Sequence, residues 1–184
     1  MYPDIPALTI FIIVAAFSPG PNNFLASYSG FNFGIKKTAP LIFGVTFGFP
    51  ILLIAVNSGL MIVFKQFEMF QEIITILGSI FLVYLSYKIA TTGKTKVKDI
   101  KNPAKFLNML IFQFINPKAV IVAIIMVSTF ISQKENFLRD TLIVVSFSIF
   151  FSFLSISSWT LLGKFLQRFA NNEKFLRVYN YVMS

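Results

Sequence analysis

The chain has 184 residues, of which 56% are apolar and only 12% are charged, and its mean hydropathy is +0.76. A soluble domain usually carries about 25% charged residues, so this composition excludes a soluble globular protein, a disordered chain and a soluble nucleic-acid binder. The absence of cysteine and histidine argues against disulfides, iron–sulfur clusters, zinc, haem and imidazole-based catalysis. We expect a membrane protein with no metal, no cofactor and no nucleic-acid partner.

Five apolar stretches are long enough to cross a bilayer as helices, which takes about 20 residues. They cover residues 5–28, 38–64, 70–90, 106–131 and 141–162. Each run is continuous rather than alternating, which predicts helices rather than strands. Residues 173–184 resemble the opening of a sixth span, so the chain is either a five-span form or a truncated six-span one. The predicted fold is an all-α integral membrane protein with five complete transmembrane helices plus the start of a sixth.

The positive charges predict the orientation, because lysine and arginine near span ends stay in the cytoplasm. The predicted extracytoplasmic side carries only three basic residues, Lys65, Lys134 and Arg139, and Lys118 falls inside a span. This asymmetry predicts a multi-pass membrane protein with an extracytoplasmic N-terminus and a cytoplasmic lysine-rich loop. Twelve of the 16 basic residues fall on the predicted cytoplasmic side: Lys36, Lys37, Lys88, Lys94, Lys96, Lys98, Lys101, Lys105, Lys164, Arg168, Lys174 and Arg177.

One linker-like segment, residues 91–105, divides the predicted single transmembrane domain of residues 1–184. Residues 1–90 form a first half of three spans, and residues 106–184 form a second, incomplete half. The lysines of the segment, with the net charge of +9, are explained by cytoplasmic anchoring and attraction to anionic membrane lipid. Binding of a specific partner by this loop is the alternative.

Two proline motifs interrupt the apolar stretches. The first span contains Ser18-Pro19-Gly20-Pro21-Asn22-Asn23 near its middle, and the fourth contains Asn116-Pro117-Lys118. Proline removes a backbone donor and clashes with the preceding turn, so both helices should unwind there. Such breaks persist in hydrocarbon only where they are buried in protein or line a polar cavity. We predict that these nine residues form a substrate site, and a packing kink without a ligand is the alternative.

The two motifs lie at corresponding positions, each in the first span of its half. Because three spans are an odd number, the second half enters the membrane from the opposite side. This is the arrangement of a 3+3 inverted repeat, in which broken helices meet near the midplane. The free N–H groups at the start of each half-helix suit an anionic group such as a carboxylate.

Lys118 is the basic residue deepest in a span, and a charge there is costly. It either pairs with a substrate carboxylate or extends to an interface. Ser148, Ser152 and Ser155 share one face of the fifth span, where helix packing is favoured over a pathway. Gly44 and Gly48 likewise predict close helix packing, whereas Gln113 carries no specific signal.

These motifs, with Asn32-Phe33-Gly34 after the first span and Gln113-Phe114-Ile115 before the second break, resemble the LysE/RhtB family of bacterial amino-acid exporters. The paired asparagines of the first motif are most similar to the cysteine/O-acetylserine branch. The resemblance implies six spans in the bacterial plasma membrane with an extracytoplasmic N-terminus. It also implies an assembly that is often a homodimer, and efflux of amino acids or their derivatives driven by the proton motive force. Many relatives carry aspartate at the position of Asn22, so a membrane-embedded proton carrier is not evident here.

The leading hypothesis is a secondary transporter that exports amino acids or small amino-acid derivatives. In it the substrate carboxylate binds at the broken helices, and the two halves rock to expose the site alternately. A non-transporting accessory subunit is one alternative. A membrane enzyme acting on lipid is the weaker one, because the seven acidic residues are scattered in loops and offer no pair for Mg²⁺.

Overall fold

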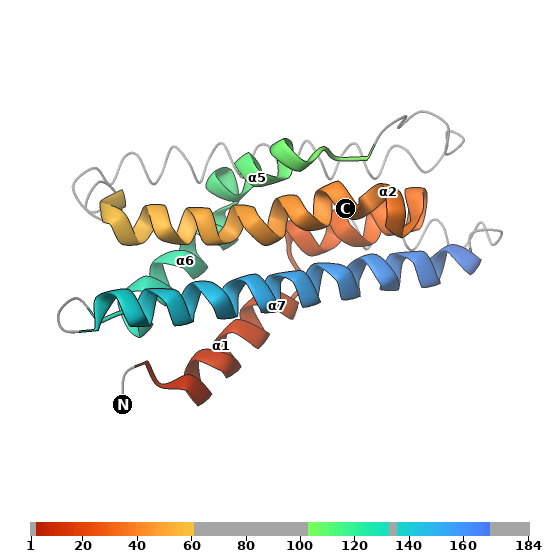
Figure 1. Ribbon diagram of the computed structural model, residues 1–184. Coiled ribbons are helices and arrows are strands. Elements are labelled where there is room, and N and C mark those ends of the chain that lie inside the picture. Colours follow the sequence, from red (N-terminus) through yellow and green to blue (C-terminus); the bar gives the residue numbers. More distant parts are fainter. Residues whose placement is uncertain (1–2, 61–102, 133–135, 170–184) are drawn as a thin grey trace.

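The structure, a computed structural model, describes residues 3–60, 103–132 and 136–169. All regular elements in these ranges are helices (Figure 1). The predicted third span, most of the 91–105 loop and the 173–184 segment lie outside the described residues. The helices are α1 (Ile5–Phe17), α2 (Pro21–Ala55), the π-helical turn η1 (Val56–Leu60), α5 (Phe106–Ile115), α6 (Pro117–Phe130), α7 (Phe137–Leu166) and the 3₁₀ turn η3 (Gln167–Phe169).

The first predicted span is divided as its prolines indicate. Helix α1 begins after Asp4, whose carboxylate accepts from the N–H of Ala7 at 3.0 Å and caps the helix. It ends at Phe17, and residues 18–20 are not helical. Helix α2 then begins at Pro21, where proline is tolerated because the first helical N–H has no intrahelical partner.

Helix α2 is interrupted at Gly34, whose backbone angles are φ 75° and ψ 173°. The hydroxyl oxygens of Ser29 and Thr38 lie 2.9 Å apart, whereas nine residues of continuous helix would separate them by about 13.5 Å. The chain therefore turns back, and residues 21–33 and 35–55 lie side by side (Figure 1). The first span thus continues to residue 33 rather than ending at the predicted residue 28, because the helix persists until the glycine that can adopt a positive φ.

The fourth predicted span is also present as two helices. Helices α5 and α6 are separated by the single residue Asn116 and are bent by 68° relative to each other. The fifth span matches α7, which is four residues longer at each end than predicted. Helix α7 crosses the whole described part of the molecule, next to α1 and both arms of α2 (Figure 1).

Glycines allow the helices to pack backbone to backbone. A methyl group added at Gly30 would overlap the carbonyl of Thr160, and one at Gly163 would overlap the carbonyl of Ser27. Residues 21–33 and α7 are therefore joined by a reciprocal glycine contact. The prediction that Gly44 and Gly48 serve packing is confirmed, since both face the backbone of α5.

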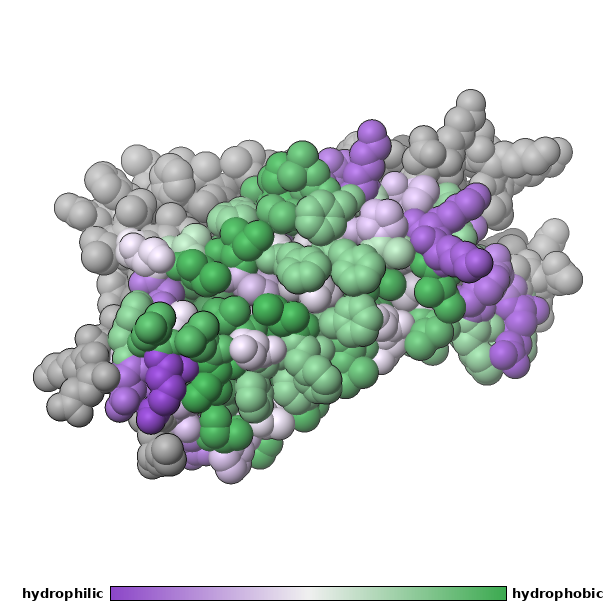
Figure 2. Space-filling model, in the orientation of Figure 1, coloured by the Kyte–Doolittle hydropathy of each residue, from purple (hydrophilic) through white to green (hydrophobic). Residues whose placement is uncertain are grey.

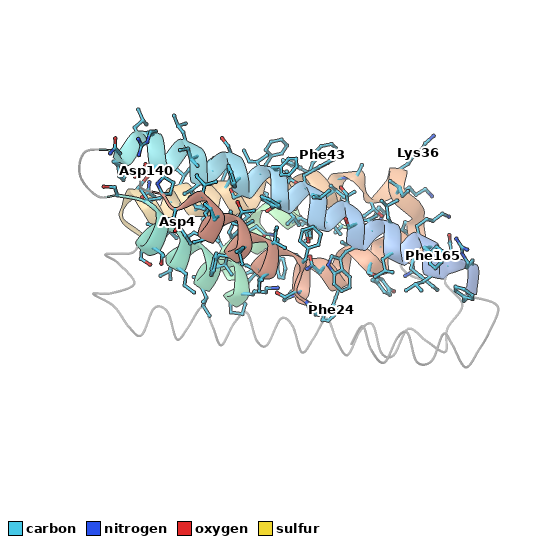
Figure 3. All side chains as sticks on the ribbon, turned by 90° about the horizontal axis from the view of Figure 1, so that it is seen from below. Asp4, Phe24, Lys36, Phe43, Asp140 and Phe165 are labelled. Carbon is cyan, nitrogen blue, oxygen red and sulfur yellow. The ribbon has the colours of Figure 1, made fainter. Side chains whose placement is uncertain are left out.

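The surface of the described residues is that of a membrane protein. Helix α2 with η1 and helix α7 are each long and apolar enough to cross a bilayer, and α5 with α6 forms a third candidate span. Large apolar side chains face outward, among them Phe150 at 61% exposure and Leu161 at 53%. Figure 2 shows this hydrophobic surface as a broad band between hydrophilic ends. Asp4 and Asp140 lie at one end, and Lys36 lies at the other (Figure 3).

Candidate functional site

The first break exposes the carbonyl end of α1 and the amide end of α2. Ser18 and Gly20 are both extended, and Gly20 offers no side chain to cap α2. The gap is held by Asn23, which is 3% exposed and donates through Nδ2 to the carbonyls of Ala16 at 2.7 Å and Ser18 at 2.8 Å. Asn23 therefore supplies a donor to each of two carbonyls that lack an intrahelical partner at the end of α1.

The second break consists of Asn116 alone. Its backbone is extended, and its side-chain Oδ1 accepts from the N–H of Lys118 at 3.2 Å. Its own N–H donates to the carbonyl of Phe112 at 2.9 Å. Asn116 thus closes α5 and caps α6 with its own groups, and Pro117 occupies the first helical position of α6.

The two breaks lie next to each other, although they are about 100 residues apart in the chain. Lys118 Nζ donates to the carbonyl oxygen of Ser18 at 2.8 Å, to the Ser18 hydroxyl at 2.9 Å and to the carbonyl oxygen of Pro19 at 3.3 Å. In Figure 1, α1 and α6 extend to the left of the breaks, and residues 21–33 and α5 extend to the right. The two broken spans therefore meet at their interruptions.

A second contact between the broken spans is an amide pair. Asn22 Nδ2 donates to Gln113 Oε1 at 2.7 Å, and Gln113 Nε2 donates to Asn22 Oδ1 at 3.2 Å. Gln113 is fully buried, and its Nε2 also donates to the carbonyl of Met109 at 2.8 Å. No motif in the sequence assigned a specific role to Gln113. What the sequence does show is an amide side chain within the apolar run that precedes the second break.

A cavity of about 70 Å³ adjoins the breaks and is bordered by α1, α2, α6 and α7. A cavity of this volume has room for several water molecules. Among the residues that line it, Lys118 is the ionisable one and none is acidic. The described part of the chain also contains no cluster of three His, Cys, Asp or Glu residues that could hold a metal ion. The cavity is thus a small, mostly apolar space with amide, hydroxyl and ammonium groups on its wall.

Six of the nine predicted site residues line this cavity. The other three are Ser18 and Pro19, which contact Lys118 through their oxygens, and Pro117, which begins α6. The structure therefore brings both motifs together. The lining residues are Gly20, Pro21, Asn22, Asn23, Asn116 and Lys118.

The serines of α7 also line the cavity, so this face contributes to the cavity wall in addition to the helix packing that the sequence favoured. Ser148, Ser152 and Ser155 all border the space. Ser155 Oγ donates to the carbonyl of Ala16 at 2.7 Å and so connects α7 to the end of α1. Ser148 Oγ donates to the carbonyl of Val145 within its own helix. The sequence places the three serines on one face of the helix. Only the packing of α1 against α7 shows that this face borders the cavity.

The comparisons with known proteins agree on one family. Residues 13–184 match the family described as LysE type translocator. A cysteine/O-acetylserine efflux protein of Klebsiella pneumoniae subsp. pneumoniae is 24% identical over 167 residues, covering 89% of this chain and 84% of that protein. Proteins of the same name from Escherichia coli (strain K12) and Shigella flexneri are 28% identical over 168 residues, 88% of this chain and 83% of each relative. No solved structure matches. The chain belongs to the LysE type translocator family of multi-pass membrane proteins.

Proposed function

We propose that this protein is a secondary transporter that exports amino acids or small amino-acid derivatives across the bacterial plasma membrane. The observation that carries this proposal is the contact of two broken spans beside a cavity that holds a lysine. Broken helices that meet inside a bundle are the usual construction of substrate sites in secondary transporters. Membership in a translocator family excludes the alternative of a membrane enzyme.

The substrate carboxylate binds at the start of α2 and near Lys118. The first backbone N–H groups of α2 lie at the positive end of the helix dipole, and Gly20 supplies no side chain that occupies them. A small side chain then fits against the apolar wall near Ala15 and Met126, with Ser152 of α7 as a polar neighbour. Cysteine and O-acetylserine, the substrates in the names of the relatives, are the first compounds to test.

The topology that we propose has five complete spans and the start of a sixth. Residues 1–90 and 106–184 form inverted halves, and the 91–105 loop and the basic helix ends face the cytoplasm. Supporting this, a methyl group at Gly34 would lie 4.0 Å from Lys164 Nζ, so the turn beside Lys36 adjoins the end of α7. Asp4 and Asp140 lie at the opposite end (Figure 3), which is the end proposed to face outward. Proton coupling and a homodimer remain predictions from the family resemblance.

The test is efflux from proteoliposomes that contain the purified full chain and radiolabelled L-cysteine or O-acetyl-L-serine. We expect wild-type protein to release the label when a proton gradient is imposed. Lys118→Ala removes the ammonium group and should lower net efflux about tenfold, the effect of losing one charge-assisted hydrogen bond. Pro21→Ala favours a continuous helix across the break and should also lower net efflux.

Matched controls keep the test specific. Pro40→Ala replaces another proline of α2, and Lys36→Ala removes an exposed lysine; neither residue lines the cavity. Both controls should transport at the wild-type rate. Unchanged efflux in Pro21→Ala and Lys118→Ala would remove the proposed site. A wild-type chain that transports neither compound alone but copurifies with a stoichiometric partner would favour the accessory-subunit hypothesis.

A further inference from the structure

The end of α1 presents a group of oxygen atoms that suits an ammonium ion. We define the α1 oxygen cluster as the carbonyl oxygen and hydroxyl of Ser18 and the carbonyl oxygen of Pro19. Carbonyls at a helix C-terminus lack intrahelical partners and lie at the negative end of the dipole. Because no acidic residue lines the adjoining cavity, this cluster supplies the negative partial charge that a cation meets there.

In the structure Lys118 fills this cluster completely. An ammonium group has three N–H donors, and Nζ has three oxygen neighbours at 2.8, 2.9 and 3.3 Å. The Ser18 hydroxyl donates its own hydrogen to the carbonyl of Ala15 at 3.2 Å and is therefore an acceptor toward Lys118. Every Lys118 donor is then in use, so Lys118 must leave the cluster before it can bind a substrate carboxylate.

The amino group of an amino acid is also an ammonium ion with three donors. We infer that Lys118 is a built-in substitute for the substrate's amino group and occupies the amine position while the transporter is empty. When a substrate binds, its ammonium group takes the α1 oxygen cluster, and Lys118 moves to the substrate carboxylate. This inference rests on the proposed export function and identifies the ligand of each charged group of a zwitterionic substrate.

The residue opposite Lys118 provides independent support for this position. A methyl group on Gly20 would lie 2.9 Å from Lys118 Cδ and 3.0 Å from Nζ. The backbone of Gly20 is extended, with φ 176°, a conformation open to any residue. Glycine here leaves the space that the lysine side chain occupies, and its backbone conformation does not itself require glycine. The same contact predicts that alanine at position 20 would displace Lys118 without straining the chain.

The consequence concerns the empty transporter. Without Lys118, the Ser18 hydroxyl and the Pro19 carbonyl lose the donor that Lys118 supplies whenever no substrate is bound, which is costly in a nonpolar environment. The Ser18 carbonyl loses one of its two donors and retains Asn23. With substrate bound, the substrate's own ammonium group satisfies these oxygens. Loss of Lys118 should therefore slow the return of the empty transporter much more than the movement of the loaded one.

The experiment compares two transport modes in proteoliposomes that contain the full chain. Net efflux of radiolabelled O-acetyl-L-serine into buffer requires the empty transporter to return. Exchange against unlabelled O-acetyl-L-serine does not. For Lys118→Ala we expect net efflux to fall about tenfold while exchange at saturating substrate falls less than about threefold. The contacts with the α1 oxygen cluster are missing only in the empty state, and the missing contact with the carboxylate weakens substrate binding, which saturating substrate offsets. Gly20→Ala should show the same pattern more weakly, and Lys36→Ala should change neither mode.

The outcomes separate this inference from the proposed function. If Lys118→Ala loses net efflux and exchange equally while wild-type protein transports, Lys118 only binds the carboxylate or only fixes α1. The inference is then overturned, and the export function stands. If Lys118→Ala changes neither mode while wild-type protein transports, the inference is overturned and the export function stands. If the wild-type chain transports nothing, both proposals fail. Net loss with retained exchange, reproduced by Gly20→Ala, supports the inference.

Discussion

The two helix breaks achieve the same interruption in different ways. The second consists of one residue, and Asn116 satisfies the adjoining backbone with its own side chain and N–H. The first spans residues 18–20, and its carbonyls are satisfied from outside, by Asn23 of the following helix and by Lys118 of the other broken span. The second break is therefore local in origin, whereas the first depends on the tertiary structure.

This difference indicates which break can respond to a ligand. A break that is capped by its own residue has no donor or acceptor to exchange. A break whose carbonyls are capped by a charged side chain from another helix can exchange that partner for a substrate. We therefore assign the conformational response to the first break, and the variants below test this assignment through the free energy of unfolding in detergent.

The largest effect should come from Asn23→Ala. It removes two hydrogen bonds and leaves the carbonyls of Ala16 and Ser18 buried without these donors, which should lower the unfolding free energy by about 3 kcal/mol. Thermal or denaturant unfolding of the purified protein measures this. Asn32→Ala, which removes one bond to the nearby Tyr28 carbonyl, is the control and should cost about 1 kcal/mol or less. Equal losses in the two variants would contradict the dependence of the first break on Asn23.

Gly163→Ala should have the next largest effect, because its methyl group overlaps the backbone of Ser27. Overpacking of this kind costs about 1–3 kcal/mol, and here it moves residues 21–33, which follow the first break, away from α7. The same unfolding assay applies. The control is Ser157→Ala, at another position of α7, which should be nearly neutral. Gly59→Ala would not serve, because Gly59 has φ 119° and any side chain there would strain the backbone. A neutral Gly163→Ala would show that the first break does not need this packing.

Asn116→Ala should have a smaller effect than Asn23→Ala, since only a helix cap is lost. Loss of an asparagine cap costs about 1 kcal/mol. Asn116→Asp keeps a side-chain oxygen at the cap and should retain most of the stability. If Asn116→Ala cost as much as Asn23→Ala, the two breaks would not differ in the way described.

The smallest effect is the coupling between Asn22 and Gln113. A double-mutant cycle with alanine at both positions should give a coupling energy of about 1 kcal/mol, typical of residues in contact. The control cycle pairs Gln113→Ala with Asn32→Ala, whose side chain bonds within its own helix, and should show no coupling. Coupling below about 0.3 kcal/mol in the first cycle would place the Asn22–Gln113 pair outside the interactions that join the two breaks.

The breaks were predictable from sequence because proline acts locally. Pro21 and Pro117 each begin a helix after an interruption, as their missing N–H groups require. The turn at Gly34 follows the Asn32-Phe33-Gly34 motif, and its positive φ explains the glycine. The end of the first span was harder to place, since the residues between 28 and 33 are compatible with either a helix or a loop.

The partners of the site residues could not be predicted in the same way. The Asn22–Gln113 pair joins residues 91 positions apart, and the Ser155 hydroxyl binds a carbonyl 139 positions away. No local pattern specifies such contacts, because they depend on how α5 and α7 pack against the first span. The lysine was identified from its cost inside a membrane, but the three oxygens that it contacts were not.

The glycine contact between residues 21–33 and α7 has a mechanical consequence. Two helices whose backbones touch behave as one rigid body, because neither can rotate or slide without a collision at Gly30 or Gly163. Helix α1, by contrast, contacts α7 near the break through the hydrogen bond from the Ser155 hydroxyl to the Ala16 carbonyl. Because the non-helical residues 18–20 separate α1 from α2, a change in the angle between these two helices would leave the glycine contact intact.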